Sequence, residues 1–452
     1  MSAYASAELS PVEVARDALE RIKAVDGELH AFITLDEHGT LAQAEESERR
    51  YRDGEARVLE GVPISVKDAF HQRGLATSLG SLHYKDQISE ADSGVVARLR
   101  EAGAVFTGKT NTAEFGQSAT TDNLLGPDTA NPWDPARTSG GSSGGAAASV
   151  GAGMSTLAVG SDGGGSIRIP AAFCGVFGLK PTRGLCSDEG GFQAMTEFVS
   201  PGPIAHSAAD ARPMLEVLAD RSYTRQLFRP LSIGYCPRPE NRAVHPGVVE
   251  VTDEAARLLE GLGHRVEQVD LPLGGWVEVF GPLVLEDESR ERAHLLDRPE
   301  MLTDYERRSL EAAQHLDPAD VERARRDLPA YRQQISDIFL GYDVILTPAT
   351  AVPAFPLGQR PKTIDGQKVD WLWGAFPFAV PFNVAGTPAA SVPAGLVEGL
   401  PVGIQLVTPM HTEARLLDIA QSLEELLNFP KEQAFLRWDQ ASVAVASSPV
   451  KS

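Results

Sequence analysis

Two serines in glycine-rich turns are the residues of this sequence best suited to covalent chemistry. Ser142 lies in the segment 140–145, which reads Gly-Gly-Ser-Ser-Gly-Gly, and Ser166 follows three consecutive glycines at 163–165. Consecutive glycine N–H groups can form a concave nest that binds an oxyanion, so a serine in such a turn is a candidate nucleophile. No histidine lies between residues 140 and 170, so activation of either serine requires another base.

One lysine occupies an unusual position for its type. Lys67 ends the apolar run 61–67, Gly-Val-Pro-Ile-Ser-Val-Lys, which predicts a short buried strand. A single lysine is most often a solvated surface group. A lysine at the end of a buried strand fits that description poorly, and burial favours its neutral, basic form.

Two short motifs point to other protein classes, but their surroundings argue against both. Residues 103–110 match the phosphate-binding pattern G-x-x-x-x-G-K-[ST]. A helix is predicted before the first glycine and the intervening residues are strand-like, which is the wrong order for a P-loop. Residues 140–144 match the G-x-S-x-G nucleophile elbow, which requires a buried strand before it. The preceding residues 131–138 contain two prolines and predict a loop instead.

Composition and charge indicate an ordinary globular protein. The chain has 452 residues, 42% of them hydrophobic, and 41 basic against 62 acidic side chains give a formal charge of −21. This charge disfavours nucleic-acid binding, which depends on basic side chains that neutralise phosphates. The N-terminus shows no signal-peptide pattern, and no apolar run is long enough to span a membrane. With three cysteines and no metal-ligand spacing, we expect a cytoplasmic protein with free thiols and no bound metal.

Alternating helices and strands predict one large α/β unit. Ser10, Pro11 and Glu13 form a capping-box signature at the start of the first long helix. Further helices are predicted near residues 41–52, 93–102, 208–219, 249–262, 275–335 and 412–427. Strands are predicted near residues 61–67, 104–107, 177–181, 202–205, 231–235, 344–347, 389–394 and 402–407. The small, polar residues 436–452 predict a mobile tail.

Taken together, the motifs resemble the amidase signature family of serine hydrolases. The resemblance covers roughly residues 8–430. It rests on the lysine strand, the two serine loops at 140–145 and 160–170, and matching blocks at 108–116, 177–184, 382–389 and 400–405. It implies a single domain over residues 1–435, built on a mixed, twisted central β-sheet covered by helices on both faces. Within that domain we expect core motifs at 60–205, a variable helical segment at 206–340, and a C-terminal sheet and helix part at 341–435. Residues 108–110, the end of the P-loop match, are implied to form a structural turn.

The resemblance assigns roles to individual residues. Ser166 matches the family's nucleophile, Lys67 its base, and Ser142 the bridging serine, which follows a cis peptide bond. The implied oxyanion hole consists of the backbone N–H groups of Gly163, Gly164, Gly165 and Ser166. Three further positions are implied to brace the two loops by hydrogen bonds: Ser143, Asp162 and Arg168. Ser143 is also the predicted N-cap of a helix over residues 146–152.

These roles imply amide hydrolysis through an acyl-enzyme. Neutral Lys67 takes the proton of Ser166 through Ser142, and the acid so formed protonates the leaving amine, which departs badly as an anion. Water then repeats the sequence on the acyl-enzyme. The mechanism requires no cofactor and no metal.

The substrate is predicted from an aromatic cluster ahead of the block 382–389, formed by Trp371, Trp373, Phe376 and Phe378. We expect at least two of the four to lie in the core and the others to form an aromatic wall of the site. Such a wall predicts a neutral aryl or arylalkyl amide as the small-molecule substrate. We expect no nucleic-acid or membrane partner, and a homodimer stays open. The alternative is the glutaminase subunit of a tRNA-dependent amidotransferase, which needs a partner chain, and a more remote one is a P-loop nucleotide-binding protein.

Overall fold

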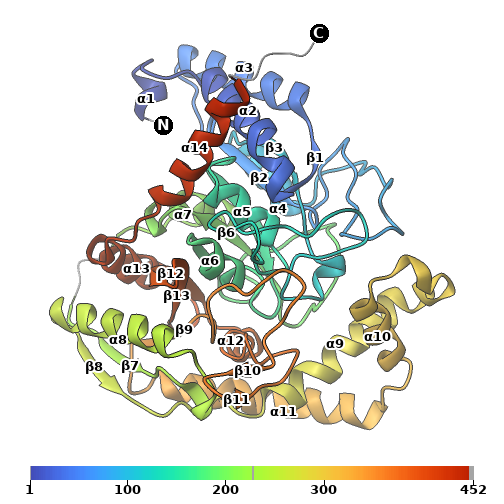
Figure 1. Ribbon diagram of the computed structural model, residues 1–452, viewed down its shortest axis with the longest axis vertical. Coiled ribbons are helices and arrows are strands. Elements are labelled where there is room, and N and C mark those ends of the chain that lie inside the picture. The colour runs from blue at the N-terminus through green and yellow to red at the C-terminus, as the bar shows by residue number, and fades with distance from the viewer. Residues whose placement is uncertain (1, 226–228, 447–452) are drawn as a thin grey trace.

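One mixed β-sheet runs through the computed structural model, which describes residues 2–225 and 229–446 (Figure 1). In this part of the chain the sheet has eleven strands. Strand β2 pairs in parallel with β3 and with β4, and β7 pairs in parallel with β8 and with β9. The other neighbouring strands pair in antiparallel fashion. The predicted single α/β domain is therefore confirmed. From edge to edge the strands are β1 (Phe32–Leu35), β3 (Val105–Thr110), β2 (Pro63–Lys67), β4 (Leu157–Asp162), β6 (Ser200–Ala205), β5 (Phe177–Lys180), β12 (Ala389–Val397), β13 (Leu400–Val407), β9 (Val344–Pro348), β7 (Ser232–Tyr235) and β8 (Arg265–Gln268).

Helices cover both faces of this sheet. One face packs against helices α4, α7, α8 and α13, which form a hydrophobic core with alternate strand residues. The other face packs against α2, α5 and α6, which form a second core. A third hydrophobic core contains residues of α9, α11 and α12. Among the described residues no helix combines the length and apolarity needed to cross a bilayer. The helices are α1 (Ser2–Ala5), α2 (Pro11–Leu29), α3 (Glu37–Asp53), α4 (Gly94–Glu101), α5 (Gly144–Gly151), α6 (Arg168–Cys174), α7 (Ala208–Ala219), α8 (Pro246–Gly261), α9 (Trp276–Arg292), α10 (Asp304–Ala313), α11 (Pro318–Ile338), α12 (Val380–Ala385), α13 (Glu413–Leu427) and α14 (Glu432–Ala446), and a small hairpin joins β10 (Thr363–Ile364) to β11 (Gln367–Lys368).

The P-loop-like segment is part of the sheet. Residues 108–110 belong to strand β3, so the expected structural turn at this position is wrong. Lys109 is buried, and its Nζ lies 2.7 Å from Asp68 Oδ1. A lysine engaged in this way cannot reach a phosphate, which argues against the P-loop interpretation.

The C-terminal segment is a docked helix over residues that we expected to form a mobile tail. Helix α14 packs along α2 (Figure 1). The buried Trp438 donates its Nε1–H to the carbonyl of Pro132 at 2.9 Å, and the Arg21 guanidinium lies over the ring of Phe435. The prediction is therefore wrong for residues 436–446, because two aromatic anchors attach the segment to the domain. Residues 447–452 lie outside the described part of the chain.

The alternation of strand β2 places its lysine on the face of the sheet that α5 covers. Ile64 and Val66 point into the core beneath α4 and α7. Ser65 and Lys67 point to the opposite face, because successive side chains of a strand alternate. There the Ser65 hydroxyl lies 2.8 Å from the hydroxyl of Ser149 on α5. Lys67 is thereby directed toward the N-terminal end of α5, which Ser142 precedes.

Candidate active site

Lys67 and two serine hydroxyls form the centre of the candidate site. Lys67 ends β2 and is fully buried. Its Nζ lies 2.7 Å from Ser142 Oγ and 2.9 Å from Ser161 Oγ. Burial lowers the pKa of Lys67 from 10.5 to about 7, although the Asp162 carboxylate opposes the shift. A substantial fraction of this lysine is therefore neutral near pH 7 and able to accept a proton.

The two serine loops are joined to each other through Ser143. The peptide bond between Gly141 and Ser142 is cis, as the resemblance implies. Ser143 occupies the N-cap position of α5, but its hydroxyl makes no capping bond, so that part of the prediction is wrong. Instead it donates to the carbonyl of Ser161 at 3.2 Å, while the Ser143 N–H donates to the carbonyl of Ser166 at 3.1 Å. The sequence motifs do not single out Ser161, whose one signal is its place in the second serine loop.

The turn around Ser166 presents three unpaired backbone N–H groups among the described residues, rather than the four that the resemblance implies. The N–H of Gly165 donates to Asp162 Oδ1 at 2.8 Å, so this residue is already engaged and is not a free oxyanion donor. The N–H groups of Gly163, Gly164 and Ser166 make no hydrogen bond within the described residues. Gly165 has a φ of +118°, and a Cβ there would lie 2.7 Å from the Cβ of Ala379, so only glycine fits this turn.

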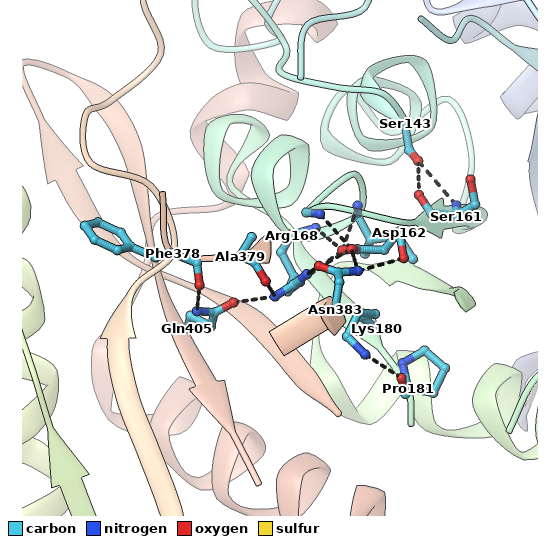
Figure 2. A network of polar contacts seen from close by, with 12 residues as sticks. Ser143, Ser161, Asp162, Arg168, Lys180, Pro181, Phe378, Ala379, Asn383 and Gln405 are labelled. Atoms are coloured by element: carbon cyan, nitrogen blue, oxygen red, sulfur yellow. Dashed lines mark hydrogen bonds and ion pairs between the residues drawn. The ribbon is translucent and has the colours of Figure 1, made fainter. Parts of the chain in front are cut away.

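A buried ion pair holds the second serine loop in place (Figure 2). Arg168 donates to both carboxylate oxygens of Asp162 at 2.9 Å, and its Nη1 donates to Gln405 Oε1 at 2.7 Å. Asn383 donates to the same carboxylate at 2.8 Å. Although burial raises the pKa of Asp162, the Arg168 guanidinium lowers it well below its usual range. The two residues that were expected to brace the loop are thus tied to segments far away in the sequence.

Removing the guanidinium should destabilise the whole domain. In Arg168→Met, Asp162 would remain buried without its counter-ion, and we expect the free energy of unfolding to fall by about 3–5 kcal/mol. Urea denaturation followed by circular dichroism measures this change. Arg325→Met, which removes an exposed ion pair with Glu286, is the matched control and should cost about 1 kcal/mol or less. Equal losses in the two variants would contradict the structural role of the buried pair.

Two cavities meet at Ser166. The first has a volume of about 340 Å³ and is lined by Lys67, Ser142, Ser161 and Ser166, together with the segment 183–196. The second has a volume of about 640 Å³ and is lined by Ser166, Gly164 and several aromatic side chains. Ser142 and Ser166 face the same first cavity, but no direct hydrogen bond joins their hydroxyls in the described structure.

The aromatic wall of the second cavity differs in part from the predicted one. Trp371 and Trp373 line the cavity. Of the four candidate substrate-binding residues, Phe376 and Phe378 are fully buried in a core beside α6 and do not line the cavity, as the sequence predicts for at least two of the four. The wall also contains two residues of α9 that the sequence did not predict, Trp276 and Phe280. Trp373 packs edge-on against both rings, with centroid distances of 5.4 and 5.9 Å.

Comparison with known proteins agrees with this geometry. The profile of the Amidase family matches residues 13–417. The chain belongs to this family. A crystal structure described as an amidase superposes on this amidase with a TM-score of 0.88 at 31% identity, over 94% of this chain and 98% of the other. A bacterial aryl acylamidase of the amidase signature family gives a TM-score of 0.84 at 26% identity, over 99% and 98%. The predicted family, fold and amide C–N hydrolysis are therefore confirmed.

Curated relatives of this amidase carry a more specific name. The A subunit of glutamyl-tRNA(Gln) amidotransferase from Carboxydothermus hydrogenoformans is 35% identical, over 94% of this amidase and 95% of the relative. The protein of the same name from Chromohalobacter salexigens is 32% identical, over 92% and 93%. These relatives agree better with the glutaminase alternative than with an aryl amide substrate.

Proposed function

We propose that this amidase hydrolyses its substrate through an acyl-enzyme on Ser166, with Ser142 as proton relay and Lys67 as base. The contact of 2.7 Å between Lys67 Nζ and Ser142 Oγ carries the proposal, because it joins a relay hydroxyl to a lysine with a pKa of about 7. A hydrogen bond from the Ser166 hydroxyl to the Ser142 hydroxyl forms when substrate binds and completes the proton relay, since catalytic hydrogen bonds often tighten only in the enzyme–substrate complex. Ser161 holds the lysine from its other side.

The two cavities separate the two halves of the substrate. The leaving amine must take its proton from Ser142, so it departs through the first cavity, which Ser142 lines. The acyl group then occupies the second cavity on the other side of Ser166. The tetrahedral oxyanion is held by the N–H groups of Gly163, Gly164 and Ser166, and losing one such donor typically costs about 3 kcal/mol.

The first candidate substrate is an amide with an apolar acyl group. The aromatic side chains of the second cavity support it, because each methylene buried there contributes about 0.8 kcal/mol. This candidate includes the neutral aryl and arylalkyl amides that the sequence predicts.

The second candidate is glutamine hydrolysis within a tRNA-dependent amidotransferase, where this chain would be the glutaminase component. The identity of 32–35% to the amidotransferase relatives over most of both chains supports it, and these relatives favour it over the first candidate. In this case the expectation of no nucleic-acid partner would not hold for the assembly. The charge of −21 is compatible with a partner chain that makes the tRNA contacts.

A substrate comparison distinguishes the two candidates. The first candidate predicts that kcat/KM, measured as ammonia release by the purified chain, is at least about tenfold higher for phenylacetamide than for glutamine, since a ring buried in the aromatic cavity contributes about 1.5–3 kcal/mol. The same assay with acetamide gives the contribution of the ring. A higher kcat/KM for glutamine would contradict the first candidate and favour the second.

A further inference from the structure

A buried carboxylate lies along the wall of the second cavity. Glu288 follows Phe280 and Val284 on α9 at helical spacing, so all three side chains lie on the face that lines this cavity. Glu288 is 1% exposed. Its Oε2 accepts a hydrogen bond from the Ser309 hydroxyl of α10 at 2.6 Å. Its Oε1 is buried and has no hydrogen-bond partner among the described residues. The lining of this cavity therefore includes a carboxyl group with one unpaired oxygen.

The surroundings of Glu288 hold more buried carboxyl groups than cations. Helices α9 and α10 lie side by side (Figure 1), and the buried Glu288 and Glu306 lie beside the guanidinium of Arg292, with the buried Glu114 near Glu306. Arg292 donates to Glu306 at 3.0 Å, but its Nη2 is 3.8 Å from Glu288 Oε1, beyond hydrogen-bond distance. Burial raises the pKa of Glu288 and raises that of Glu306 to about 8, although Arg292 opposes both shifts. A cation beside Glu288 would favour the ionised form of its carboxyl group.

Arg292 does not donate to Glu288 Oε1, although its Nη1 and Nη2 have no other hydrogen-bond partner among the described residues. Its guanidinium stacks on the ring of Phe115, 4.9 Å from the centroid, and lies 5.7 Å from the centroid of Phe192. Among the described residues that line the second cavity, the one cationic side chain is Arg308, which is exposed and shares the lining with the exposed Asp304. Within the described lining, the carboxylates thus outnumber the cations.

We propose that the second cavity binds acyl groups that carry a primary ammonium, with Glu288 as the residue that accepts its hydrogen bond. The inference rests on the proposed function, since it places the acyl group in this cavity. The apolar walls between Ser166 and Glu288, which include Trp276 and Phe280, accommodate the methylenes or ring that separate the amide from the ammonium. An ammonium brings both the donor that Glu288 Oε1 lacks and a positive charge that favours the ionised carboxylate.

Matched substrates of increasing length test this proposal. In each pair an ω-aminoalkanamide is compared with the alkanamide in which a methyl group replaces the ammonium. We expect the ratio of their kcat/KM values to reach at least about tenfold at the length that spans Ser166 to Glu288, which is the effect of one hydrogen bond to a charged group. A ratio at or below one at every length would overturn the proposal and would indicate that Glu288 Oε1 is satisfied by bound water.

Two variants on the same helix identify the residue that is responsible. Glu288→Gln keeps the shape of the side chain but removes its charge, and it should bring the ratio close to one. Glu286→Gln, at a partly exposed position ion-paired with Arg325, is the matched control and should leave the ratio unchanged. An unchanged ratio in Glu288→Gln would also overturn the proposal. If that variant does not fold, the series of matched substrates measured on the unmodified chain is enough to test the proposal. The proposed function is tested separately. If the unmodified chain hydrolyses the neutral alkanamides and Ser166→Ala does not, the proposed function is supported whatever the ratio of kcat/KM values.

Discussion

Replacing Ser166 with alanine is expected to lower kcat for amide hydrolysis by roughly 10⁵–10⁶-fold, the scale of loss when a catalytic serine is removed. Ser166 lies where both cavities meet and follows the N–H groups of Gly163 and Gly164, so its hydroxyl is the one placed to attack a carbonyl whose oxygen these groups hold. Steady-state kinetics of ammonia release measures the loss, and circular dichroism checks that the fold persists.

Ser161→Ala is the matched control for this experiment, because Ser161 lines the first cavity and also contacts the lysine. It lacks the oxyanion donors that surround Ser166, so we expect a much smaller loss from this variant. A nearly inactive Ser161→Ala beside an active Ser166→Ala would show that Ser166 is not the nucleophile.

The pH dependence of activity should follow the ionisation of Lys67. Because burial lowers its pKa to about 7 and only the neutral amine accepts a proton, kcat/KM should rise as the pH increases through about 7 and level off above it. Lys67→Ala should lose about 10²–10⁴-fold in kcat, the usual contribution of general acid–base catalysis. It should also lose the rising limb of the profile.

Lys180 provides a stringent control for this assignment. It is also fully buried, and burial likewise lowers its pKa to about 7, but its Nζ donates to the carbonyl of Pro181 at 2.8 Å and to no serine in the described part of the chain. Lys180→Met should therefore keep the rising limb that Lys67→Ala loses. If the rise of kcat/KM with pH disappeared in Lys180→Met but remained in Lys67→Ala, the proposed role of Lys67 would be contradicted.

Local sequence signals predicted the elements that carry the proposed catalytic groups. The apolar run before Lys67 specifies a buried strand whatever surrounds it, and the glycines before Ser166 specify a tight turn. The capping box at Ser10 forms as expected, with both of its hydrogen bonds present. These features depend on neighbouring residues in the chain, so the sequence contains the information needed to place them.

The features that the sequence did not predict depend on contacts between distant segments. Trp276 lies about a hundred residues from Trp373, and only the folded chain brings the two rings together. The orientation of the Gly165 N–H toward Asp162 is set by the three-dimensional turn rather than by residue type. Docking of α14 likewise requires the surface of α2, so composition alone suggested a tail.

Mapping the covalent adduct of a fluorophosphonate by peptide mass spectrometry tests the central claim most directly. The acyl-enzyme proposal predicts a single adduct on Ser166, prevented by prior incubation with an amide substrate that competes for the site and absent from Ser166→Ala. An adduct on Ser142 or Ser161 of the unmodified chain, or labelling that persists in Ser166→Ala, would contradict it.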